Sequence, residues 1–251
     1  MHILISNDDG VQARGLAELV EAVRSLGRVT VVAPDAPRSG AANQITTNMP
    51  LRLQLVRKEE GLEIYKCSGT PTDCVKVALH ALFRDQKPDL LLSGINHGRN
   101  DGVCVFYSGT IGAAIEGAIA GVPAIAFSRN LHNDGGSFEH CTTFARDIVR
   151  QITQTPLPAK TLLSVNFPYD GTKGVKWVRQ ATGRYTNEYF ESSDAAGDTV
   201  YWMQGDQSDP EQRTDTDLYW LEQGYTTVTP IQLDLTDYSY LNTLQRDKLF
   251  V

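Results

Sequence analysis

The 251-residue sequence lacks the signals of several protein classes. No apolar run approaches the roughly 18 to 20 residues that cross a bilayer. The start, MHILISNDD, has acids where a signal peptide needs a basic start and a long apolar stretch. The four cysteines form no C-x-x-C pair and no Cys/His spacing of the kind that structural zinc sites use. We therefore expect a cytoplasmic protein with reduced thiols, and neither export nor membrane insertion.

Three common catalytic signatures are also absent. The sequence contains no G-x-S-x-G elbow and no G-x-x-x-x-G-K-[ST] phosphate loop, and its first strand-to-helix turn lacks G-x-G-x-x-G. Acyl transfer, P-loop hydrolysis and dinucleotide redox chemistry thus lose their usual support. There is also no large internal repeat and no low-complexity tract.

The charge is distributed unevenly along the chain. The formal net charge is −7, yet residues 185–237 hold twelve acids and one base, a balance of −11, so the other residues sum to +4. A near-neutral to slightly basic body is compatible with a small anionic substrate. The acidic segment disfavours a long polyanion, and we expect no stable binding of duplex nucleic acid.

Short apolar runs alternate with helical periodicity over the first two thirds of the chain. Predicted strands cover residues 2–6, 28–33, 89–93, 123–128 and 161–166, and a hairpin pairs 51–55 with 62–67. Predicted helices carry Leu16 to Leu26, Val75 to Phe83 with Thr72 as the cap, 110–121 and 138–152. This alternation predicts an α/β fold with a doubly wound, mostly parallel sheet covered on both faces.

The pattern changes after Pro168. Strand-like segments at 175–180, 199–203 and 225–233 are separated by polar linkers, and a helix is expected at 234–249. We assign residues 1–168 to a catalytic core and 169–251 to a β-rich appendage with a C-terminal oligomerisation arm and helix. Its exposed aromatic strands would invite aggregation in a monomer, so we expect exchange of the arm between subunits.

Polar loops follow the predicted parallel strands, where sites of open sheets lie. Asp8 and Asp9 end the first strand, and two adjacent anions are costly there without a cation. Asp8, Asp9, Ser39 and Asn96 offer oxygen ligands only, which suits magnesium or manganese. Alone, Asn-Asp-Asp-Gly is more often a helix cap or an Asx turn.

Further polar residues lie in these loops. Ser108, Gly109 and Thr110 precede a small-residue helix whose free N–H groups and dipole favour a phosphate, although an N-cap with a tight turn explains them equally well. Asn43 and Asn100 are candidates to contact a phosphate oxygen or the leaving group, or braces of their loops. His97 is a candidate acid, but a lone loop histidine is more often solvated.

Five blocks, in order along the chain, resemble the SurE family of stationary-phase survival proteins, which are divalent-metal-dependent 5'/3'-nucleotidases. They are ILISNDDGV from residue 3, VAPD from 32 with RSG from 38, GTPTDCV from 69, SGIN-x-G-x-N from 93 and YSGT from 107. Shorter matches continue at 224–225, 229–230 and 234–236. The resemblance therefore covers most of the chain, but not residues 186–216.

The resemblance implies a Rossmann-like core, dimers or tetramers joined through C-terminal exchange, and hydrolysis of nucleoside monophosphates. It implies one divalent cation per subunit on Asp8, Asp9, Ser39 and Asn96. We assign catalysis to Asp8, Asp9, Asn43 and Asn96, and substrate binding to Ser39, Gly40, Asn43, Ser108, Gly109 and Thr110. Where the family often has an acid before Tyr107, this chain has VCVF.

Our hypothesis is metal-activated attack of water on the phosphorus, which releases nucleoside and phosphate. One alternative is an aspartyl-phosphate phosphatase of the haloacid-dehalogenase kind, although its D-x-D nucleophile loop is replaced here by Asn7-Asp8-Asp9. Another is a non-catalytic nucleotide or metal sensor, because binding and hydrolysis use the same residues.

Overall fold

The computed structural model describes residues 1–130, 136–208 and 212–247. Its centre is one nine-stranded sheet, in which six neighbouring strands, β4, β2, β1, β5, β6 and β7, run parallel. In spatial order the strands are β3 (Leu53–Glu59), β4 (Leu62–Cys67), β2 (Arg28–Pro34), β1 (His2–Ser6), β5 (Leu90–His97), β6 (Ala124–Arg129), β7 (Thr161–Phe167), β13 (Thr226–Gln232) and β8 (Val175–Trp177). The predicted α/β fold is confirmed.

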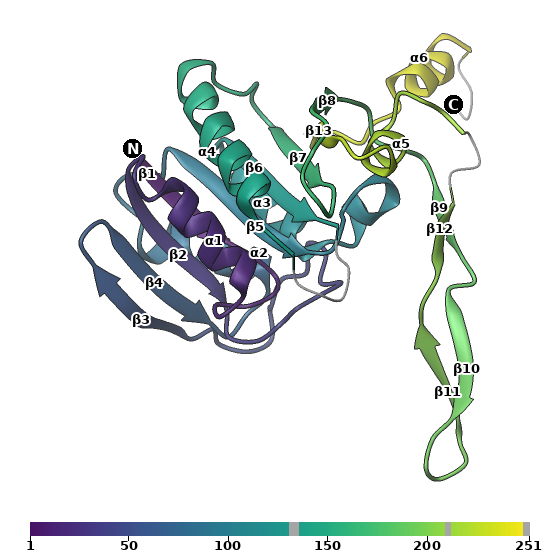
Figure 1. Ribbon diagram of the computed structural model, residues 1–251, viewed down its shortest axis with the longest axis horizontal. Coiled ribbons are helices and arrows are strands. Elements are labelled where there is room, and N and C mark those ends of the chain that lie inside the picture. The colour runs from purple at the N-terminus through teal and green to yellow at the C-terminus, as the bar shows by residue number, and fades with distance from the viewer. Residues whose placement is uncertain (131–135, 209–211, 248–251) are drawn as a thin grey trace.

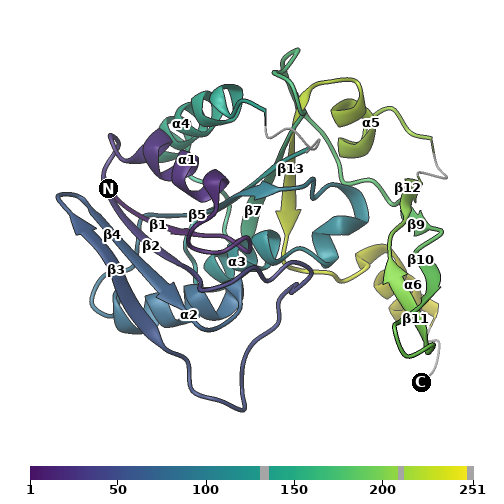
Figure 2. The ribbon, with the colours of Figure 1, turned by 60° about the horizontal axis from the view of Figure 1, so that its bottom comes forward.

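Helices cover both faces of this sheet (Figure 1). One face carries α1 (Arg14–Val23) and α4 (Glu139–Gln154), and the other carries α2 (Pro71–Ala81) and α3 (Gly109–Ile119), as Figure 2 shows. Each face has its own apolar cluster, because strands such as Ile3-Leu4-Ile5 send alternate side chains to opposite sides. The cysteines Cys67, Cys74, Cys104 and Cys141 are buried and free, which confirms the prediction of reduced core thiols.

Several predicted boundaries are wrong, among them that of the first hairpin strand, which spans Leu53–Glu59 and not 51–55. The cap of α2 is Thr70, not Thr72, because Pro71 occupies the first helical position and Asp73 completes a capping box with Thr70. The polar residues 94–97 continue β5, which an irregularity between Ser93 and Asn96 bends at its end. The strand predicted at 175–180 ends at Trp177.

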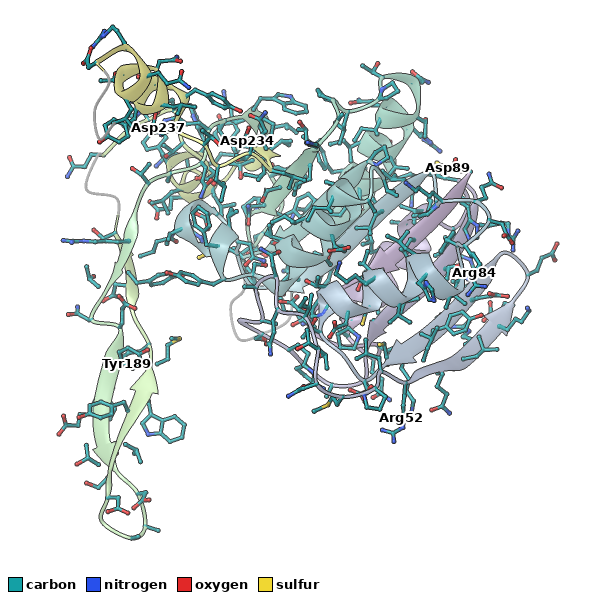
Figure 3. The ribbon with its side chains drawn as sticks, turned by 180° about the vertical axis from the view of Figure 1, so that it is seen from behind. Arg52, Arg84, Asp89, Tyr189, Asp234 and Asp237 are labelled. Carbon is teal, nitrogen blue, oxygen red and sulfur yellow. The ribbon has the colours of Figure 1, made fainter. Side chains whose placement is uncertain are left out.

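The chain after residue 168 serves both the sheet and an arm. Strand β13 pairs antiparallel with β7 and parallel with β8, and the short helix α5 (Asp217–Glu222) packs on it. Two antiparallel ribbons project from the body, with Tyr189 labelled on one of them in Figure 3. They consist of β9 (Arg184–Thr186) with β12 (Asp206–Ser208) and of β10 (Tyr189–Ser193) with β11 (Thr199–Met203).

The terminal helix α6 spans Tyr238–Asp247 and buries none of its residues in the single chain. It starts later than predicted, and residues 248 and 249 of the predicted helix lie outside the described residues. Among the described residues, no helix combines the length and apolar character that crossing a bilayer requires.

Candidate functional site

Asp8 lies at the carboxyl end of β1 and is 4% exposed. Its carboxylate accepts a hydrogen bond from the hydroxyl of Thr110 in the first turn of α3. Burial, and to a smaller extent the charge of the neighbouring Asp9, raise the pKa of Asp8 to about 6, although the hydrogen bond from Thr110 lowers it. A cation at this position would relieve the cost of the buried charge.

Asp9 is half-buried and its carboxylate accepts the backbone N–H of His97 over 3.0 Å. This bond ties the end of β1 to the end of β5, where Asn96 lies. The Asn96 side-chain nitrogen donates to the Gly98 carbonyl over 2.9 Å. The amide oxygen of Asn96 therefore remains as its ligand atom.

The loop after β2 is hydrogen-bonded to the segment that follows β1 and to the segment that precedes α3. The Arg38 N–H donates to the Asp8 carbonyl over 2.7 Å, which places Ser39 next to the end of β1. The Ala42 N–H donates to the Tyr107 carbonyl over 3.0 Å, which holds Asn43 beside the start of α3. Loops that are distant in sequence thus converge at one edge of the sheet, as the strand-end argument predicts.

Gly109 makes the close approach of α3 to Asp8 possible. A Cβ atom on this residue would lie 2.9 Å from the Asp8 Cβ, 3.1 Å from its Oδ2 and 3.1 Å from Pro71 Cγ. Gly112, one turn later, faces the Ala42 carbonyl, which a Cβ would meet at 2.1 Å. The small residues that the sequence places here are therefore required by packing against the site.

The hydroxyls of the expected phosphate loop already have local partners. Ser108 is the N-cap of α3, and its oxygen accepts the Ile111 N–H over 3.2 Å. Thr110 is bound to Asp8, so in this structure it orients a predicted metal ligand. The helix start still points its positive end toward Asp8, which also favours a bound anion.

The donor set fits a hard divalent cation. Within residues 1–130, 136–208 and 212–247, no group of three or more His, Cys, Asp or Glu side chains is placed to hold a metal ion. A cation at this edge would therefore take hydroxyl and amide oxygens beside the carboxylates, and magnesium and manganese accept such ligands. Asp8, Asp9, Ser39 and Asn96 are the residues that would hold it.

Two other candidate polar residues have structural roles. Asn100 is buried, its N–H donates to the Asn166 side chain over 2.7 Å, and its side chain donates to the Ser128 hydroxyl over 2.8 Å. It braces β6 and β7. The His97 ring packs against Phe138, with 5.8 Å between the ring centroids.

A cleft of about 720 Å³ opens beside Ser39, within the size range of ligand sites. Its walls are residues 37–41, 44–49 and 68–70. The Arg38 side chain donates to the Ser68 carbonyl over 3.2 Å and lies 3.5 Å from the Asp35 carboxylate. The cleft thus adjoins the candidate metal site through the Arg38–Asp8 backbone bond.

This chain is similar to known proteins along most of its length. The family model described as survival protein SurE matches residues 3–187. The 5'-nucleotidase SurE of Porphyromonas gingivalis strain ATCC 33277 is 46% identical over 245 residues, 98% of this chain and 95% of that protein. The 5'-nucleotidase SurE of Bacteroides thetaiotaomicron is 44% identical over 244 residues, 96% of this chain and 94% of that protein.

A solved structure is similar over the whole chain. The crystal structure of the SurE protein from Aquifex aeolicus has a TM-score of 0.84 and 36% sequence identity, and the match covers 99% of this chain and 100% of that chain.

Proposed function

Because this chain belongs to the SurE family, we propose that it is a nucleotidase that hydrolyses nucleoside monophosphates with the help of a divalent cation. The observation that carries the proposal is the buried Asp8, held by Thr110 beside Asp9 at the end of β1. The names of the relatives support the nucleotidase activity. The oxygen donor set supports magnesium or manganese as the cation.

We assign a separate role in hydrolysis to each group of site residues. Asp8, Asp9, Ser39 and Asn96 would hold the cation, and when bound it would supply a Lewis acid that makes water more acidic and offsets phosphate charge. The start of α3, capped by Ser108, would direct the N–H groups of Gly109 and Thr110 and the helix dipole at the phosphate. Asn43 stabilises the charge that develops on the phosphate oxygens, and Gly40 lets the loop pass close to them.

Phosphate release from a panel of nucleoside monophosphates tests this proposal. We expect turnover with magnesium or manganese and loss of turnover when a chelator removes the metal, with recovery when the metal is restored. Absence of phosphate from every substrate at micromolar enzyme would contradict the proposal and favour a sensor. An acyl-phosphate adduct found by mass spectrometry would instead favour the aspartyl-phosphate mechanism.

Replacing Gly109 with alanine is expected to reduce turnover by up to about 100-fold, because the new Cβ pushes against the Asp8 carboxylate and shifts this proposed metal ligand by up to about 1 Å. The stability loss should be about 1–3 kcal/mol. Initial rates and a urea titration measure the two effects.

Gly117→Ala is the matched control for Gly109→Ala. It adds the same methyl group to α3, but against Leu91, 2.9 Å from its Cδ1. We expect a comparable loss of stability with turnover near that of the wild type. Equal losses of turnover in the two variants would contradict the assigned role of Gly109.

We also propose a homodimer or homotetramer joined through the C-terminal region. The arm exposes large apolar side chains from both strands of one ribbon, including Phe190 at 55% and Trp202 at 65%. The helix α6 adds Tyr238 and Tyr240, also exposed in the single chain. Such surfaces are commonly covered by a partner, and exchange of identical arms does so in a closed assembly.

A further inference from the structure

Residues 44–49 form one wall of the cleft beside Ser39, and we call this segment the strap. It belongs to the long loop between β2 and β3, which contains no helix or strand (Figure 2). The strap exposes apolar side chains, with Ile45 at 48% and Met49 at 64%, next to the polar Thr47 and Asn48. A wall of this kind suits a ligand with an apolar face and a polar rim.

The strap is held by the first turn of α2. The Asp73 carboxylate accepts the Thr46 N–H over 3.0 Å at Oδ1 and the Thr46 hydroxyl over 2.6 Å at Oδ2. The Thr70 hydroxyl donates to the Gln44 carbonyl over 2.6 Å. The capping pair of α2 therefore fixes two points of the strap.

The buried Asp73 side chain both completes the capping box of α2 and holds Thr46 of the strap. It is 2% exposed, and its Oδ2 also accepts the Thr70 N–H over 2.9 Å. Burial raises the pKa of Asp73, but the bonds from Thr46 and Thr70 outweigh it and lower the pKa below the ordinary value. The carboxylate is thus charged at neutral pH and accepts three hydrogen bonds, which are stronger than those between neutral groups.

We propose that the strap forms the subsite for the nucleoside part of the substrate, and that Asp73 is the positioning residue that holds it in place through Thr46. This inference rests on the proposed nucleotidase function. The phosphate end of a nucleoside monophosphate would lie at Asp8 and Ser39, and the cleft adjoining Ser39 is the space available for the nucleoside. Ile45 and Met49 would contact the base, and Thr47 and Asn48 its polar edge or the ribose hydroxyls.

Thr46→Val tests the subsite without disturbing the helix cap. It removes only the hydroxyl bond to Asp73 and keeps the Thr46 N–H bond and the Thr70–Asp73 capping box. For the nucleoside monophosphate that the wild type hydrolyses fastest, we expect KM to rise about fivefold and kcat to stay within about twofold, as the loss of one hydrogen bond predicts. Thr46→Ser, which keeps the hydroxyl, should restore KM.

Product inhibition separates the two ends of the substrate. In Thr46→Val the inhibition constant of the matching nucleoside should rise about fivefold, while that of inorganic phosphate stays within about twofold. Asp73→Asn should raise KM further, because its amide nitrogen cannot accept the bonds that one carboxylate oxygen accepts. Thermal melting of each variant verifies that it is folded.

Three results would overturn the subsite: an unchanged KM, a nucleoside that does not inhibit the wild type, or equal rises in the inhibition constants of nucleoside and phosphate. The last would mean that the strap supports only the phosphate end. Failure of the proposed function is a separate result, since the wild type would then release no phosphate with any metal.

Discussion

Replacing Asp8 with asparagine is expected to reduce turnover by about 1,000-fold or more, because the variant loses a charged ligand of the cation that supplies the Lewis acid. Calorimetric titration with magnesium or manganese should show the parallel loss of metal affinity. In the presence of chelator the variant should melt at the wild-type temperature or above it. The substitution removes a buried charge whose burial raises its pKa to about 6.

Asp85→Asn is the control for this substitution. Asp85 is exposed in the connection from α2 to β5, which enters β5 at its amino end, whereas the site lies at the carboxyl ends of the parallel strands. The same chemical change there should leave metal binding and turnover unaltered. An Asp8→Asn variant with metal-dependent hydrolysis near the wild-type rate would remove Asp8 from the site.

The convergence of the site loops could be predicted from the sequence because it follows from strand order alone. Asp8 and Asn96 each follow an apolar run, and parallel strands end at the same edge of a sheet. The structure adds contacts that periodicity does not encode. Thr110, read as a phosphate ligand, donates its hydroxyl to Asp8, and Gly109 provides the space for that approach.

The role of Asp73 was missed although a local signal for it exists. Thr70-Pro71-Thr72-Asp73 has a hydroxyl and an acidic residue at capping-box spacing, with proline at the first helical position. Placing the cap at Thr72 shifted the start of the helix and hid the pair. The bonds that Thr46 donates to Asp73 depend on how a loop 27 residues earlier in the chain folds back, which no local pattern determines.

The C-terminal third could be predicted as β-rich, but its place in the fold could not. The run at 225–233 reads as an arm because it follows polar linkers, yet β13 lies between β7 and β8 in the main sheet. Because β13 and β7 are far apart in the sequence, their pairing depends on which side chains become buried together. Val228 of β13 is fully buried in the larger apolar cluster. Among the described strands, the ribbons β9–β12 and β10–β11 are the ones that project as an arm.

Deleting residues 216–251 is therefore expected to prevent folding to a soluble protein, although Asp8, Asp9, Ser39 and Asn96 all remain. The deletion removes β13 and the buried Leu218, Leu221 and Val228, whose burial contributes about 5–9 kcal/mol in total. That sum is comparable to the whole free energy of unfolding of a typical domain. The soluble fraction after expression measures the effect.

The deletion also removes a contact on the site side of the sheet. The Asp217 carboxylate accepts the Gly102 N–H over 2.9 Å and the Ala181 N–H over 2.8 Å, which anchors the segment that leads to Ser108. A soluble, cooperatively melting 1–215 fragment would contradict the structural role of β13.

Deleting only residues 237–251 is the matched comparison, because the described residues it removes bury nothing in the single chain. This shorter variant should stay soluble and melt cooperatively.

Light scattering of the full-length protein at micromolar concentration should report at least a dimer, and a stable 27.7 kDa monomer would refute the proposed assembly. Fewer subunits in the shorter variant would assign α6 to the subunit contact. An unchanged number of subunits would assign the contact to the ribbons, which expose Tyr189, Phe190, Tyr201 and Trp202.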